Sequence, residues 1–186
     1  MIRKESIDRF FDYDLHVESR TLYIGGKEID EQSAERVIKA LHILQSEKDI
    51  NIILNSFGGC WFQGMAIYDA IASCSCHVNA TVYGSAMSMG SVILQAADSR
   101  IIHPNATIMV HDGYETRVDD IPRTFQNWAE YSKRSQQRMY EIYAGRSGRP
   151  PSFWKKKCAS DAILTAKEAL ELGLVDSIFK VNNDSL

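Results

Sequence analysis

The segment Tyr83-Gly-Ser-Ala-Met-Ser-Met-Gly-Ser91 lies between two apolar stretches of different character. Residues 78–83 are β-branched and aromatic, which predicts a short buried strand. Residues 89–97 are apolar and predict a helix inside the domain. The small residues at the junction allow the backbone to turn sharply from strand into helix. Ser88 would then lie at a helix N-terminus, where unpaired N–H groups and the helix dipole favour negative charge.

Ser88 has two interpretations at this position. A lone serine at a helix start is most often an N-cap. Acyl transfer also uses such a place, because attack on an amide carbonyl creates an oxyanion. A nucleophilic serine needs a base, and His111 closes an apolar strand at residues 108–110. Asp161 is a candidate third member because Thr165, not Asp161, caps the next helix, but Asp98 and Asp112 compete on residue type alone.

The order of elements predicts an α/β domain. Strands are expected at residues 21–24, 50–54 and 78–83, and helices follow from Asp30, at 61–74 and at 89–97. This alternation favours mostly parallel strands joined by helical crossovers. Further elements are two short strands at 101–102 and 107–110, a long helix at 119–144 broken by 145–151, a helix at 166–172 and a closing strand at 174–179. The helix after residue 61 is expected to bury Met65, Tyr68 and Ile71 or Ala72.

The length of 186 residues predicts one domain over residues 1–186, with residues 1–20 as a polar N-terminal arm. A net charge of −3 and the lack of long basic runs argue against a nucleic-acid partner. No apolar stretch is long enough to cross a membrane and no signal-peptide core is present, so we expect a cytoplasmic protein. The four cysteines lack metal-ligand spacing, and we expect neither a metal nor a cofactor.

Four motifs resemble motifs of the proteolytic subunit of the ATP-dependent Clp protease, ClpP, and its phage-type relatives, and they occur in the same order as in that family. Residues 55–59 resemble the family's Asn-Ser-Pro-Gly-Gly, and residues 84–90 its Gly-x-Ala-Ala-Ser-Met-Gly. Residues 108–111 resemble Ile-Met-Ile-His. Residues 161–176 resemble the closing Asp-x-x-x-Ser-Ala-x-Glu-Ala with Gly-Leu-Ile-Asp. The likeness extends from Thr21 to Phe179 and implies the ClpP/crotonase-like α/β fold with a long protruding handle helix at 119–144.

The resemblance implies a role for each residue of a serine protease site. Ser88 would be the nucleophile, His111 the general base and Asp161 the group that orients the imidazole. The N–H groups of Gly59 and Met89 would form the oxyanion hole. An extended peptide would be held by strand addition along two segments, with Gly58, Gly59, Asp112 and Gly113 as the substrate-binding residues.

The resemblance also implies an assembly. Relatives form seven-membered rings that stack through the handle helix into a tetradecamer, enclose the active sites and cleave unfolded polypeptides fed by a ring ATPase. Here Asn51, Ile53 and Ser73 stand where relatives carry aromatic residues for docking that ATPase. Phe57 replaces the family's proline, and residues 112–113 replace its Gln-Pro. We therefore hypothesise a peptidase that works without a standard Clp ATPase, and docking of such a partner stays open.

Three alternatives follow from the same sequence. A phage-type head-maturation protease would share the fold and triad but cut capsid or scaffold chains without an ATPase. A crotonase-like acyl-CoA enzyme would share the fold and its paired backbone N–H groups but would not need Ser88 and His111 together. A non-catalytic ring scaffold would not need the triad residues.

Overall fold

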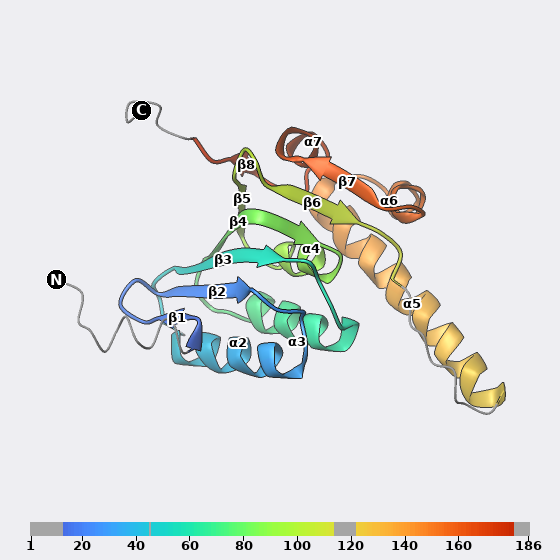
Figure 1. Cartoon of the computed structure of the whole chain (residues 1–186), viewed down its shortest axis with the longest axis horizontal. Helices are drawn as coiled ribbons and strands as arrows, with labels where there is room; N and C mark the ends of the chain where they lie inside the picture. The colour runs from blue at the N-terminus through green and yellow to red at the C-terminus, as the bar shows by residue number, and fades with distance from the viewer. Residues whose placement is uncertain (1–12, 45, 114–121, 181–186) are drawn as a thin grey trace.

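The computed structural model describes residues 13–44, 46–113 and 122–180 (Figure 1). Within these ranges a single sheet contains strands in the order β1-β2-β3-β4-β5-β8, with β6 paired to β4 and β7 paired to β6. The predicted α/β fold with mostly parallel strands is confirmed: only the β1–β2 and β6–β7 pairs are antiparallel. The strands are β1 (Leu15–His16), β2 (Thr21–Gly25), β3 (Ile50–Ser56), β4 (Val78–Met87), β5 (Ser99–Ile102), β6 (Thr107–Val110), β7 (Ala162–Thr165) and β8 (Ser177–Ile178).

Helices α2 (Glu31–Leu44) and α3 (Trp61–Ala72) cover one face of the sheet (Figure 1). Asp30 caps helix α2, as predicted, because its carboxylate accepts a hydrogen bond from the Ser33 N–H at 2.8 Å. Helix α3 buries Gly64, Ile67 and Ile71. Of the predicted inner face, Ile71 is buried, and Met65 and Tyr68 are half-buried and pack against the core. Gly64 was not predicted there; it gives a close approach, because a Cβ on it would lie 2.1 Å from the Met89 side chain.

Strand β4 is longer than predicted and joins two parts of the sheet. Residues 79–82 pair with β5 and residues 85–87 pair with β6. Between them Gly84 adopts φ +64°, and a Cβ there would lie 2.7 Å from the Asn55 side chain. The predicted turn after residue 83 is thus an irregularity within a strand that continues to Met87. The following helix, α4 (Met89–Leu94), is correspondingly shorter than the predicted 89–97.

Helix α5 (Pro122–Ser147) projects beyond the sheet in Figure 1. Its last turns are anchored in the core, where Tyr143 is fully buried and its hydroxyl lies 2.7 Å from Ser91 Oγ. The helix ends within the predicted break at 145–151, but three residues later than predicted, at Ser147. The next residue, Gly148, has φ +70° and donates its N–H to the Ala144 carbonyl at 3.0 Å, as a C-terminal glycine cap does. The predicted start at residues 119–121 lies outside the described residues.

The C-terminal region differs most from the prediction. Helix α6 (Pro151–Cys158) and strand β7 were not predicted, and the closing strand is only the two-residue β8. The predicted capping box of α7 (Ala166–Glu171) is confirmed, with Thr165 and Glu168 bonded reciprocally. Residues 1–12 of the predicted arm lie outside the described residues, whereas residues 13–20 include β1, whose Leu15 is buried against the sheet.

A buried arginine ties the C-terminal region to the sheet. Arg100 is 4% exposed, and it donates from its backbone N–H and its guanidinium to the Asp176 carboxylate at 2.6–3.1 Å. Its remaining guanidinium hydrogen bonds go to Gln95 Oε1 at 2.6 Å and to the Gly173 carbonyl at 3.1 Å. Partial burial raises the pKa of Asp176, but the hydrogen bonds from Arg100 outweigh it and lower that pKa overall.

Two further features are limited to the part of the chain that the structure describes. No helix there is both long and apolar enough to span a bilayer. In the same residues, no three His, Cys, Asp or Glu side chains are grouped so as to hold a metal ion.

Candidate active site

Ser88 stands at the junction between β4 and α4 in a strained conformation. Its φ is 50° and its ψ −123°, which is rare for a residue with a Cβ. The neighbours fix this geometry: the Ser88 N–H donates to the Met109 carbonyl at 2.9 Å, and the Ser88 carbonyl accepts from Ser91 Oγ at 2.6 Å. The side chain makes no capping hydrogen bond. The N-cap interpretation of the hydroxyl is therefore wrong, and the Ser88 side chain points elsewhere.

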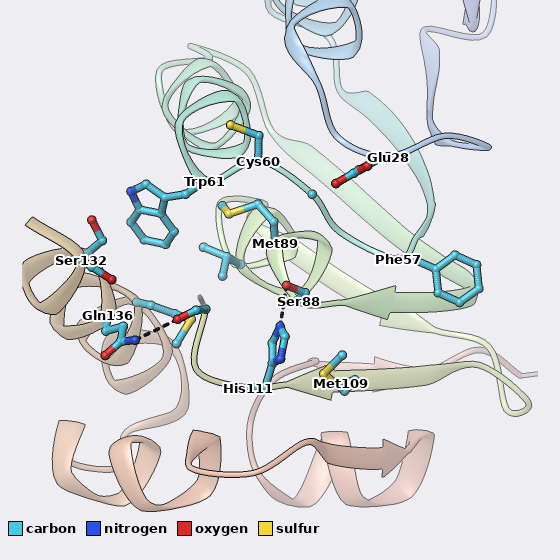
Figure 2. A pocket seen from close by; sticks show the side chains of 15 residues that line it. Glu28, Phe57, Cys60, Trp61, Ser88, Met89, Met109, His111, Ser132 and Gln136 are labelled. Atoms are coloured by element: carbon cyan, nitrogen blue, oxygen red, sulfur yellow. Dashed lines mark hydrogen bonds between the residues drawn. The ribbon is translucent and has the colours of Figure 1, made fainter. Parts of the chain in front are cut away.

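Ser88, His111 and Asp161 lie together in the order expected of a triad. The Ser88 Oγ is 2.8 Å from His111 Nε2, as Figure 2 shows. On the other side of the ring, His111 Nδ1 is 3.2 Å from Asp161 Oδ1. The pairing of β6 with β7 explains why these residues meet. The two strands are antiparallel and Val110 lies opposite Ala162, so His111, which follows Val110, lies beside Asp161, which precedes Ala162. The Asp161 side chain is 70% exposed, so its charge is largely solvated.

The competing carboxylates are engaged elsewhere. Asp112 accepts a hydrogen bond from the Tyr140 hydroxyl at 2.5 Å. Asp98 accepts one from the Val78 N–H at 2.8 Å. Residue type alone left these aspartates open as triad members, and their partners in the structure distinguish them from Asp161.

A second serine–histidine pair shows why the pair alone is not sufficient. His77 Nε2 lies 2.8 Å from Ser99 Oγ, and its Nδ1 lies 3.9 Å from Asp98. Ser99 is the first residue of β5, not the start of a helix, and it does not line the cavity described below. Ser99 therefore lies outside the cavity and away from any helix N-terminus, whereas Ser88 directly precedes α4.

The glycine loop after β3 packs directly against Ser88. Gly58 has φ +100°, and a Cβ there would lie 2.7 Å from Ser88 Cβ and 3.0 Å from the Met89 nitrogen. Ser56 Oγ accepts from the Gly58 N–H at 3.1 Å and holds the loop. Within the described residues, the N–H groups of Gly59 and Met89 donate no hydrogen bond. Both are therefore open to a negatively charged oxygen near Ser88.

A cavity of about 460 Å³ opens beside Ser88 and His111. Trp61, Met89, Val92 and Met139 supply its apolar wall, with polar side chains from α5 at its edge. Figure 2 shows Trp61 and Gln136 on one side of Ser88 and Glu28 and Phe57 on the other. A chain lying across Ser88 would therefore meet an apolar surface on one side and a carboxylate on the other.

Helices α5 and α6 both hold the segment that follows His111. Gln136 donates to the Gly113 carbonyl at 2.9 Å, and the Asp112 N–H donates to the Cys158 carbonyl at 2.7 Å. Burial, and then the hydrogen bond to Asp112, raise the pKa of Tyr140, so its hydroxyl stays protonated as the donor. Of the expected substrate-binding residues, Gly59 and Gly113 line the cavity, while the Asp112 N–H is already occupied.

Several residues of this site were not predicted from the sequence, among them Glu28, Trp61, Gln136 and Tyr140. Each lies on a helix or loop whose side facing Ser88 is set by tertiary packing. The helical pattern in α5 shows which residues are apolar but not which turn lies beside His111.

The exposed thiol of Cys60 provides a chemical test of the cavity. Cys60 lines it, whereas Cys76 and Cys158 are buried, and burial raises the pKa of the Cys158 thiol to about 12. We expect a maleimide to modify Cys60 first and to block access to Ser88, because thiol reactivity follows exposure and thiolate fraction. Peptide hydrolysis should fall with the extent of labelling. The Cys60→Ser variant should keep its activity under the same treatment; inactivation of that variant at the same rate would contradict this assignment.

Comparison with known proteins gives the same relationship by two routes. The family model described as Clp protease matches residues 5–182. Among solved structures, a point mutant of ClpP1 from Listeria monocytogenes is similar, with 29% sequence identity and a TM-score of 0.81. The match covers 90% of this chain and 95% of that one.

Proposed function

We propose a mechanism for this chain on the premise that it belongs to the Clp protease family: Ser88 is the nucleophile, His111 the general base and Asp161 the orienting carboxylate. Membership makes the chain a serine-type peptidase, a hydrolase. The observation that carries the residue assignment is the contact of Ser88 Oγ with His111 Nε2 at 2.8 Å, on the wall of the cavity.

The reaction follows from the positions of these atoms. Ser88 Oγ attacks the peptide carbonyl while its proton passes to His111 Nε2. The carbonyl oxygen becomes an oxyanion, which accepts hydrogen bonds from the Gly59 and Met89 N–H groups. His111 then gives the proton to the leaving amine, and the acyl-enzyme forms. Water enters, loses a proton to His111 and attacks the ester, which releases the carboxylic acid and restores the Ser88 hydroxyl.

Asp161 supports this sequence from the other side of the imidazole. It accepts from the Nδ1–H, which keeps Nε2 as the acceptor facing Ser88, and it stabilises the imidazolium. Because the Asp161 side chain is 70% exposed, water screens part of this stabilisation.

We propose that the active form is a ring homo-oligomer of the kind its family forms, with seven subunits and with two rings meeting through α5. The projecting α5 and its Phe125, which is 59% exposed, support a contact between copies. Burial of the sites in such a chamber would restrict substrates to unfolded polypeptides. Asn51 and Ser73 are exposed but not aromatic, which supports a subunit that does not engage a standard Clp ATPase. Degradation of a folded, tagged substrate with such an ATPase and ATP would contradict that part.

The proposal is tested by incubating the oligomer with an internally quenched peptide library and, separately, with acyl-CoA thioesters. We expect peptides to be cleaved and the thioesters to remain, because the Ser88–His111 pair has no use in a crotonase-type reaction. His111→Ala should lose peptide cleavage. Conversion of the thioesters without peptide cleavage would overturn the proposal.

Tyr140 is expected to act as a positioning residue for His111. Tyr140→Phe removes the hydrogen bond to Asp112, the neighbour of His111, while it keeps the buried ring. We expect kcat to fall about threefold to tenfold, which corresponds to the roughly 1 kcal/mol of a typical hydrogen bond, with KM little changed. Gln136→Leu serves as a comparison that releases Gly113 instead. A Tyr140→Phe variant with unchanged kcat, or with changes confined to KM, would contradict this role.

A further inference from the structure

The wall of the cavity that faces away from Trp61 contains a carboxylate. Within the residues that the structure describes, Glu28 is the one acidic side chain that lines the cavity. Figure 2 shows it on the same side of Ser88 as Phe57. On the other side of Ser88 lie Trp61 and Gln136, neither of which is charged (Figure 2). The two sides of the site therefore differ in charge.

Backbone pairing fixes Glu28 beside the glycine loop. Ile29 forms an isolated parallel bridge with Gly59, in which the Ile29 N–H donates to the Gly58 carbonyl at 2.9 Å and the Cys60 N–H donates to the Ile29 carbonyl at 2.8 Å. A Cβ on Gly59 would lie 2.7 Å from Glu28 Cγ. The stem of Glu28 thus rests on the same residue that we propose as an oxyanion donor.

No ion pair neutralises this carboxylate among the described residues. The adjacent Lys27 lines a separate small cavity together with Asp14 and Arg36. Glu28 is exposed at the cavity, and among the described residues it has no ion-pair partner, so a cation on a bound chain can pair with it. A carboxylate near the oxyanion donors also opposes the negative charge of the tetrahedral intermediate, and a substrate cation would relieve that effect.

We propose that Glu28 selects peptides that carry a lysine or arginine on one side of the scissile bond, with a large apolar residue on the other side. This inference rests on the proposed function, because it names the substrate class of the Ser88 site. The cationic side chain pairs with Glu28, and the apolar side chain enters the pocket formed by Trp61, Met89, Val92 and Met139.

The test compares matched peptides in which one lysine, or methionine in its place, is moved through the positions flanking the cleaved bond. In the wild type, kcat/KM should be about three- to fivefold higher with lysine than with methionine at one of these positions, and on one side of the cleaved bond only. This factor is in the range for an exposed ion pair. In Glu28→Gln this ratio should fall to about one, with faster cleavage of the methionine peptide. Glu28→Lys should invert the ratio, and added salt should reduce the wild-type preference.

Glu47→Gln is the matched control, because Glu47 is an exposed carboxylate that does not line the cavity. It should keep the wild-type ratio. A lysine preference that persists in Glu28→Gln, or that is lost equally in Glu47→Gln, would overturn this inference while the proposed function stands. If the wild type cleaves none of the peptides, the proposed function fails and the inference falls with it.

Discussion

Replacing Ser88 by alanine is expected to lower kcat/KM for peptide hydrolysis by about 10⁴- to 10⁶-fold, to near the uncatalysed background. The substitution removes the proposed nucleophile, the oxygen that contacts His111 Nε2. What remains is the weak effect of the Gly59 and Met89 N–H groups on direct attack by water. The measurement is the initial rate on a fluorogenic peptide at concentrations well below KM, with wild type and variant compared at equal oligomer concentration.

Ser99→Ala is the matched control for this result. It removes the other serine hydroxyl that lies 2.8 Å from a histidine and has a nearby aspartate, but away from the cavity. Its activity should stay within about twofold of wild type, as expected for a surface substitution. Native mass spectrometry should give the same oligomer for both variants. Substantial activity in Ser88→Ala, or its loss in Ser99→Ala, would contradict the assignment of the nucleophile.

Arg100→Met is expected to lower the free energy of unfolding by about 3 kcal/mol, the cost of breaking a buried, charge-assisted hydrogen-bond network. Methionine fills much of the same volume but leaves the buried Gln95 Oε1 and the Gly173 carbonyl without their donor. Urea unfolding at neutral pH measures the change. Arg100→Lys is the comparison, because it keeps the charge but not the planar fork, and we expect an intermediate loss.

Arg100→Met should also change how the free energy of unfolding depends on pH in the acidic range. The pKa of Asp176 is lowered in the folded protein, so its ionised form contributes stability above the unfolded pKa, near pH 4. That contribution is lost as the pH falls through the lower, folded-state pKa. Without Arg100 the pKa is no longer lowered, so Arg100→Met should lose less stability than wild type below pH 4. An unchanged urea midpoint, or an identical pH dependence in the acidic range, would show that this network does not hold the C-terminal region.

Sequence motifs predicted which side chains meet at the site better than they predicted its surroundings. Ser88, His111 and Asp161 were predicted from short motifs, and in the structure all three groups meet. Asp161 reaches His111 through β7, a four-residue strand whose alternation is too short to be seen in the sequence. Glu28 and Tyr140 escaped prediction because the Ile29–Gly59 bridge and the packing of α5 bring them to the site, and neither is encoded locally.

Local signals also misled where tertiary packing outweighed them. The Gly84 signal predicted a turn, but the strand continues because β6 takes over from β5 as the partner of β4. Gly145 predicted a helix end, but α5 passes through it because the cap is Gly148, whose φ is positive. Gly84 and Gly148 both adopt a positive φ. The neighbouring elements decide whether the strand or helix continues or ends there.

The identity of the nucleophile is measured most directly by treating the oligomer with a fluorophosphonate, weighing the intact protein and mapping the modified peptide. We expect one adduct per subunit, located on Ser88 and nearly absent in His111→Ala, because the imidazole activates the hydroxyl. An adduct on another serine, or peptide hydrolysis that continues in protein carrying no adduct, would contradict Ser88 as the nucleophile.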